Sequence, residues 1–232
     1  MSPVKAGIAV SLSALIPALP TALNTSSPPA FRTLVTIARS VRGSYATAIA
    51  GHPTKPSTIY NDFARYKVRT SSVAVIVADS DAPFGTVAVA ADAAIQAGWT
   101  QVWAAAPRTT GGNPSDVRPV LFIKCAPRSK SSATVVHIDD RIPIEIDVLR
   151  NHGYRLDYAP VPRDRLIADV RGTVAKHSDA TRYRNLAFIE TTQTTEWADV
   201  FFAANAARSA NVSDIVFVMN LSAHEFELLA CR

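Results

Sequence analysis

The sequence predicts an α/β (α+β) protein of two tandem small domains, each a mixed sheet with helices packed on one face. Two observations support this fold class. Short β-branched runs alternate with alanine-rich segments of helical periodicity. The same order of strand, helix and strand also occurs twice, because an offset of 113 residues superposes residues 74–106 on residues 187–219. Since many identities are alanines, the matched order of elements is the stronger argument.

Each half contains the same expected elements. In the first half we expect a strand at 31–40, a helix at 56–68, a central strand at 73–79, a helix from 84, and strands at 101–106 and 120–125. In the second half we expect strands within 142–161, a helix at 163–178, a central strand at 186–191, a helix from 197, and strands at 214–219 and 226–231. The helix from 84 carries an apolar stripe of Phe84, Val87, Ala91 and Ile95.

The residues around this helix indicate how it begins and ends. We expect Asp81 to cap its start, Pro83 to fit the first turn, and Gly98 to close its end in the left-handed conformation. In the second copy, Thr194 or Thr195 takes the capping position. The aspartates are thus first explained as turn and capping residues.

The chain ends and linkers complete the expected domain organisation. Residues 1–23 contain an apolar run after Lys5, which is read as a signal peptide or a marginal membrane anchor, with a buried or disordered cytosolic segment as the third reading. Residues 24–30 and 126–133 are expected linkers. The two domains then span 31–125 and 134–232. Export implies a periplasmic or secreted location, or an inner-membrane anchor through residues 6–23.

The net charge of +5 is concentrated in the N-terminal third. Arg65, Lys67 and Arg69 form an expected basic surface that could face an anionic surface or nucleic acid, although a solvated basic face is the commoner meaning. Nucleic acid is not an expected partner, because no recognition helix, zinc finger or aromatic RNA-binding motif accompanies the charge.

Residues for catalysis form no clear constellation. His137 shares a strand face with Asp139, but a solvent-facing strand edge is the default reading. No nucleophile elbow, phosphate loop or zinc-protease spacing occurs, and Cys125 and Cys231 are too far apart for a disulfide framework or a zinc site. We therefore expect no enzyme activity, no metal and no cofactor.

One segment resembles a known family. Residues 73–105 are similar to the C-terminal motif of the ExbD/TolR (biopolymer transport) family, and the second copy matches more weakly. The positions that match in the first copy are Val77, Ala78, Asp79, Asp81, Pro83, Phe84, Val87, Asp92, Ala97, Gly98 and Val102.

The resemblance implies a periplasmic α/β domain that acts through protein contacts or cell-wall binding. Family members also carry a membrane helix with an aspartate used in proton-driven coupling, and this chain has no acidic residue before Asp62, so the coupling role is not expected. Two tandem copies suggest a pseudo-symmetric pair that imitates the family's dimer.

The sequence thus leads to one expected function with two alternatives. The expected function is a non-enzymatic cell-envelope protein that binds an envelope protein or a cell-wall polymer through a surface around Asp79, Asp81, Phe84, Glu196 and Trp197. Phe84 and Trp197 could instead belong wholly to the core. The alternatives are a hydrolase with a site between the domains, and an anionic-surface or nucleic-acid binder.

Overall fold

The computed structural model describes residues 33–40, 43–67, 73–107, 119–123, 144–176, 186–212, 214–222 and 225–227. The expectations for residues 1–30, for the linker 126–133, and for Arg69, Cys125, His137 and Cys231 lie outside these residues.

The first half forms a six-stranded mixed sheet with two helices. Its elements are β1 (Thr33–Arg39), β2 (Tyr45–Ile49), β3 (His52–Thr54), α1 (Ile59–Tyr66), β4 (Val73–Ala78), α2 (Phe84–Gln96), β5 (Gln101–Ala105) and β6 (Pro119–Ile123). The strand order is β3-β2-β1-β4-β5-β6. β1, β4 and β5 are parallel neighbours, and the outer strands pair antiparallel.

The second half repeats this topology. Its elements are β7 (Ile144–Val148), β8 (Tyr154–Leu156), β9 (Ala159–Val161), α3 (Leu166–Lys176), β10 (Leu186–Thr192), α4 (Trp197–Ser209), β11 (Asp214–Ser222) and β12 (Glu225–Glu227). The strand order is β12-β11-β10-β7-β8-β9, again parallel at the centre and antiparallel at the edges. Both bounds of α4 lie 113 residues after those of α2, as the repeat predicts.

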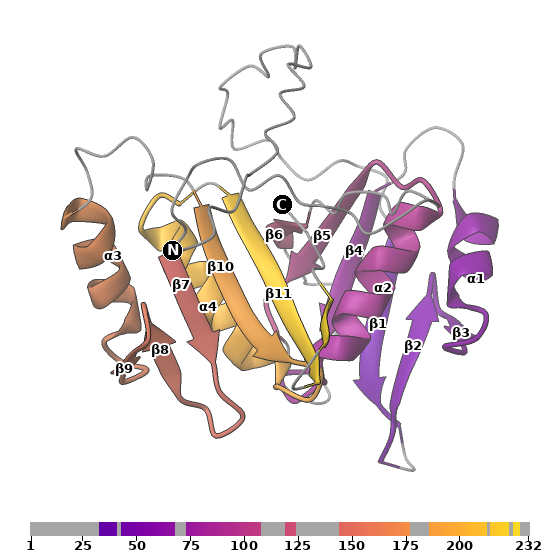
Figure 1. Cartoon of the computed structure of the whole chain (residues 1–232). Coiled ribbons are helices and arrows are strands. Elements are labelled where there is room, and N and C mark those ends of the chain that lie inside the picture. The colour runs from indigo at the N-terminus through magenta and orange to yellow at the C-terminus, as the bar shows by residue number, and fades with distance from the viewer. Residues whose placement is uncertain are drawn as a thin grey trace, which may run out of the picture.

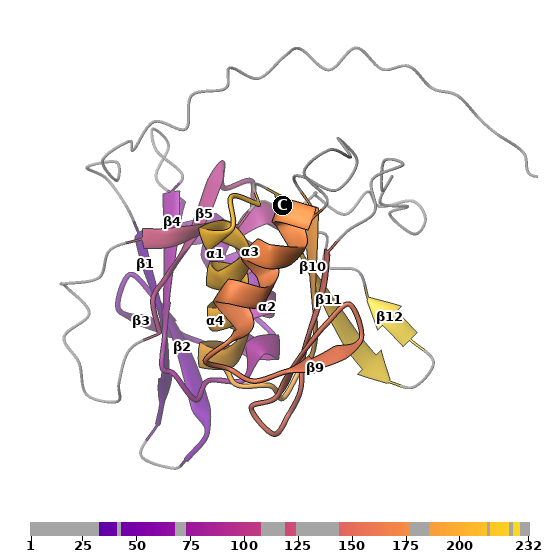
Figure 2. The ribbon, with the colours of Figure 1, turned by 90° about the vertical axis from the view of Figure 1, so that its left-hand side faces the viewer.

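The four helices lie between the two sheets (Figures 1 and 2). The helices contact one another in the order α1-α2-α4-α3. Their buried side chains and the inner faces of both sheets form one continuous hydrophobic core. All six residues of β4 are buried, as is usual for the central strand of a parallel arrangement. The predicted fold class is therefore confirmed, and the two halves share their core.

The ends of the helices follow the sequence only in part. Gly98 has φ of +78°, the left-handed conformation expected at the end of α2, and Asn211 takes the same conformation after α4 with φ of +65°. The capping prediction for Asp81 was wrong. Pro83 and Glu196 are the N-cap residues of α2 and α4, and neither helix start has a side-chain cap. Thr194 and Thr195 likewise do not cap α4.

Candidate functional site

The starts of α2 and α4 meet where the two halves join, and we call this contact the junction. Pro83 and Glu196 form an antiparallel bridge there. The four hydrogen bonds beside this bridge run in reciprocal pairs between the halves: Phe84 N–H to Thr195 O (2.8 Å), Trp197 N–H to Ala82 O (2.8 Å), Gly85 N–H to Gln193 O (2.9 Å) and Ala198 N–H to Ser80 O (2.9 Å). The amide groups that open each helix therefore find acceptors in the backbone of the other half.

These contacts explain how the helices begin without side-chain caps. The first amide groups of a helix have no acceptor within the helix, and a buried amide without a partner is destabilising. At the junction each half supplies two carbonyl oxygens to the other. Each half thus completes a helix of its partner half.

The aromatic residues nominated from the sequence are buried at the junction. Phe84 is 3% exposed and Trp197 is 0% exposed. Their rings stack with centroids 6.2 Å apart and an interplanar angle of 12°. Phe84 also packs against Phe217 of β11, with ring centroids 5.5 Å apart. The two residues therefore bind the two halves of this chain to each other, and neither lies on an exposed surface.

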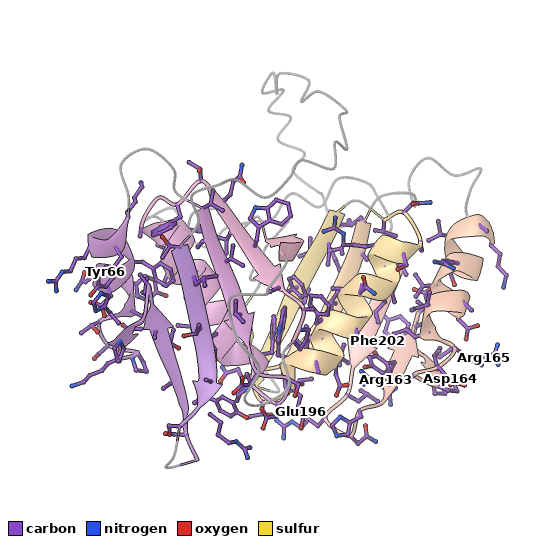
Figure 3. The ribbon with its side chains drawn as sticks, turned by 180° about the vertical axis from the view of Figure 1, so that it is seen from behind. Tyr66, Arg163, Asp164, Arg165, Glu196 and Phe202 are labelled. Carbon is purple, nitrogen blue, oxygen red and sulfur yellow. The ribbon has the colours of Figure 1, made fainter. Side chains whose placement is uncertain are left out.

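The nominated acidic residues lie at different depths. Asp79 is 1% exposed, and its carboxylate accepts a hydrogen bond from the backbone N–H of Arg39 (2.8 Å). Asp81 is partly exposed and pairs with the side chain of Arg39 (3.2 Å). Glu196 is partly exposed at the junction, where Figure 3 labels it. Asp79 and Asp81 therefore fasten the end of β1 to the turn before α2.

A polar cluster around Asp199 was not predicted from the sequence. Asp199 lies in the first turn of α4 and is 3% exposed. Its carboxylate accepts hydrogen bonds from His152 Nδ1 (2.6 Å), from Tyr154 (3.1 Å) and from Arg163. The Arg163 guanidinium also lies over the Phe202 ring, 4.5 Å from its centroid (Figure 3). We call these five residues the Asp199 cluster.

The electrostatics of the cluster follow from burial and charge. Burial by itself would raise the pKa of Asp199, but hydrogen bonds from His152, Arg163 and Tyr154 outweigh it and hold that pKa below its usual value. The hydrogen bond to Asp199 raises the pKa of His152. Burial raises the pKa of Tyr154, and the negative charge of Asp199 raises it further. The carboxylate is thus kept ionised and the phenol neutral.

Metal binding by this cluster is poorly supported. His152, Glu196 and Asp199 each bring a ligand atom to within 4.8 Å of the others. However, both carboxylate oxygens of Asp199 already accept hydrogen bonds, one of them from the cationic Arg163. A divalent cation would have to displace these donors beside a fixed positive charge. The residues fit an ion pair that fastens the β7–β8 hairpin and the turn before α3 to α4.

The chemistry open to the cluster is limited by what surrounds His152. An imidazole whose Nδ1–H donates to a buried carboxylate has the orientation that acid–base catalysis uses. Within the described residues, no hydroxyl or thiol is hydrogen-bonded to the other ring nitrogen of His152. The cluster therefore lacks a positioned nucleophile in this part of the chain.

A pocket of about 420 Å³ opens beside the junction on the side of the first half. Its size is within the range of small-molecule sites. Eight lining residues belong to the first half, and two come from the loop before α4 in the second half. The lining residues are Thr47, Lys55, Pro56, Ile59, Pro83, Gly85, Thr86, Val89, Gln193 and Thr194. The pocket thus uses both halves of the chain.

The pocket and the Asp199 cluster occupy equivalent places in the two halves. Thr86 and Asp199 are the third residues of α2 and α4, and Val89 and Phe202 are the sixth. Strand register also matches Thr47 with Tyr154, since Thr47 pairs with Ile37 of β1 and Tyr154 pairs with Val148 of β7. Pro56 and Arg163 each lie three residues before the helix that follows them. In the second half, large side chains fill the space that small side chains leave open in the first half.

The predicted basic surface is exposed where the structure describes it. Arg65 and Lys67 are exposed at the end of α1, and the Arg65 guanidinium lies over the Tyr66 ring, 5.8 Å from its centroid. Figure 3 shows Tyr66 at the outer edge of the first half, away from the junction. Neither residue lines the pocket.

Among the described residues, no helix combines the length and the apolar character that crossing a bilayer requires. Comparison of the chain with protein-family models, curated proteins and solved structures finds no match. The resemblance to the ExbD/TolR family therefore rests on the motif alone.

Proposed function

We propose that the chain is a non-enzymatic cell-envelope protein whose tandem ExbD/TolR-like halves bind a cell-wall polymer or an envelope protein. The observation that carries this proposal is the junction. The motif residues Phe84 and Trp197 stack on each other, and the backbones beside them exchange hydrogen bonds. The repeat thus builds one folded unit from two domains, in the way that a homodimer of single domains would.

Charge favours an anionic polymer over a protein as the partner. The chain carries a net charge of +5, and the exposed cations Arg65 and Lys67 lie at the C-terminal end of α1. A basic surface attracts a polyanion, and the attraction weakens as salt screens it. Proton-driven coupling is not part of the proposal, because the acidic residue that it needs before Asp62 is missing.

Cosedimentation with purified peptidoglycan sacculi tests this function. We expect the chain to pellet with sacculi at low ionic strength and to be released by added salt. The double variant Arg65→Ala with Lys67→Ala should pellet less, whereas Arg171→Ala, which removes an exposed cation from α3, should behave as the wild type. A wild-type chain that stays in the supernatant at low salt, together with no capture of an envelope protein, would contradict the proposal.

A hydrolase is the second candidate, and the pair of His152 and Asp199 is the observation in its favour. If His152 acts as a general base, the wild-type chain should hydrolyse esters or peptides, and His152→Gln should abolish that turnover. We expect no such turnover to be present, because the described residues hold no nucleophile against His152.

A further inference from the structure

We propose that the pocket beside the junction binds a small organic carboxylate with an apolar tail. This inference goes beyond the proposed polymer binding, because Arg65 and Lys67 do not line the pocket. The ligand would occupy the space that the second half fills with the side chains of Tyr154, Arg163 and Phe202.

The side chains at equivalent positions are larger in the second half than in the first. Phe202, Tyr154 and Arg163 contact one another, with the Tyr154 and Phe202 ring centroids 5.8 Å apart. Their counterparts in the first half are Val89, Thr47 and Pro56, which leave the pocket of about 420 Å³. The pocket is open to solvent beside the junction, and its size suits a small ligand.

The charge at the two equivalent places is also reversed. The second half places the acidic Asp199 at the third position of its helix, and the first half has the neutral Thr86 there. Lys55 is the one ionisable residue among those that line the pocket, and within the described residues its ammonium group makes no ion pair. In the second half, the acidic Asp199 binds the cationic side chain of Arg163. In the first half, Lys55 supplies the positive charge, so an anion is the suitable ligand.

The nearby acidic groups do not pair with Lys55. Asp62 stays ionised, because hydrogen bonds from Thr54 and Thr58 (2.8 Å) lower its pKa, but among the described residues it forms no ion pair with Lys55. Asp81 is paired with Arg39 at 3.2 Å. Neither acid lines the pocket. The ammonium group of Lys55 therefore remains available to a carboxylate.

The wall of the pocket has a polar part and an apolar part. Thr47, Thr86, Thr194 and Gln193 supply hydroxyl and amide groups that can donate to carboxylate oxygens. The apolar surface comes from Pro56, Ile59, Pro83 and Val89. Small-molecule sites usually combine apolar surface with polar groups that fix the orientation of the ligand. A ligand with a carboxylate head and a short hydrocarbon tail matches both parts.

Binding of hexanoate and hexanamide to the full chain tests the proposal, because the two probes differ in charge and hardly in shape. Titration followed by amide NMR shifts of Gly85, Thr86 and Gln193 measures both affinities. We expect a Kd of about 1 mM for hexanoate, which is reasonable for a ligand of this size, and about fivefold or more weaker binding of hexanamide.

Two variants place the ligand in the pocket. Lys55→Met should weaken hexanoate binding about fivefold and leave hexanamide binding unchanged. Val89→Phe introduces the side chain that the second half has at this position, and it should abolish binding of both probes. Lys176→Met is the matched control, because it removes an exposed lysine from the last turn of α3 and should change neither affinity. Circular dichroism and the thermal midpoint confirm that each variant is folded.

Several results would overturn the proposal. They are equal binding of the two probes, unchanged hexanoate binding by a folded Val89→Phe variant, no saturable shift at the pocket residues of the wild type, or tighter binding of inorganic phosphate than of hexanoate. Sedimentation with sacculi is a separate measurement. Loss of sedimentation with hexanoate binding intact would contradict the proposed polymer partner alone, and the reverse result would contradict the pocket ligand alone.

Discussion

Replacing Trp197 with alanine should destabilise both halves of the chain together. The indole is fully buried, with Phe84 stacked on one side and Phe201 at 5.6 Å between ring centroids. Truncation of a buried tryptophan to alanine commonly costs about 3 to 5 kcal/mol of stability. With a urea dependence of about 2.5 kcal/mol per molar, a loss of about 4 kcal/mol lowers the unfolding midpoint by about 1.5 M.

The remaining tryptophans make this prediction specific. Trp99 is 4% exposed in the first half, where its indole N–H donates to the carbonyl oxygen of Phe63 (3.1 Å), and Trp103 lies in β5 of the same half. Without Trp197, tryptophan fluorescence reports the first half alone. Far-ultraviolet circular dichroism reports both halves. We expect the two signals to change at one common midpoint in Trp197→Ala.

Trp197→Phe is the matched reference, because it also confines the tryptophan signal to the first half. It keeps an aromatic ring against Phe84 and removes an indole N–H that finds no acceptor among the described residues. We expect its midpoint to stay within about 0.5 M of the wild type, since the lost packing is partly offset by removal of an unsatisfied buried donor. If the fluorescence midpoint of Trp197→Ala equals that of Trp197→Phe while circular dichroism shows an earlier step, the halves fold independently and the reasoning fails.

Three further predictions concern the Asp199 cluster, the end of α2 and the junction. The raised pKa of His152 means that its bond to Asp199 stabilises the fold fully below pH of about 6.5, the usual histidine value, and that this contribution disappears as pH rises through the raised pKa. The fall in urea midpoint above that pH should be smaller in Asp199→Asn than in the wild type, and an unchanged fall would argue against the pair. Because Gly98 has φ of +78°, Gly98→Ala should cost about 1 kcal/mol in urea unfolding, and Gly98→Asn, which copies Asn211, should cost less; equal losses would contradict this explanation. A Cβ on Gly85 would lie 3.1 Å from both Cβ and O of Gln193, whereas one on Gly172 would meet nothing within 4 Å. Gly85→Ala should therefore lower the thermal midpoint. Gly172→Ala should raise the thermal midpoint, because it adds about 0.5 to 1 kcal/mol to the stability. A stabilising Gly85→Ala would show that the junction has room for a larger side chain.

Much of the fold could be predicted because it depends on local patterns. The β-branched run of β4 and the apolar stripe of α2 follow from side-chain periodicity, and the positive φ of Gly98 follows from the conformations open to glycine. The offset of 113 residues predicted the bounds of α4 from those of α2. The strand and helix patterns are properties of neighbouring residues, and the repeat is visible when the sequence is compared with itself.

The junction could not be predicted in the same way. Its hydrogen bonds join backbone groups, such as the carbonyl of Ala82 and the amide of Trp197, and a backbone group has no signature in the sequence. Asp81 therefore looked like a cap, although the actual acceptors lie more than 100 residues away along the chain. Burial of Phe84 against Trp197 depends on the same long-range contact.

The Asp199 cluster and the pocket had a signal that could have been read. In the aligned repeat, Thr86 stands opposite Asp199 and Val89 opposite Phe202. Such differences in charge and volume at otherwise matched positions mark places where the two halves have diverged in role. Pairing Asp199 with His152 and Arg163 needed the structure, because these residues come from three separate segments.

The location of the chain in the cell tests the proposed envelope function most directly. The measurement is the intact mass of the protein in the cytosolic, membrane and periplasmic fractions of a Gram-negative host that expresses the full sequence. The proposal predicts a periplasmic species shortened by about 22 residues, the length of the expected signal peptide, or a full-length species in the membrane fraction. A full-length species confined to the cytosol would contradict it.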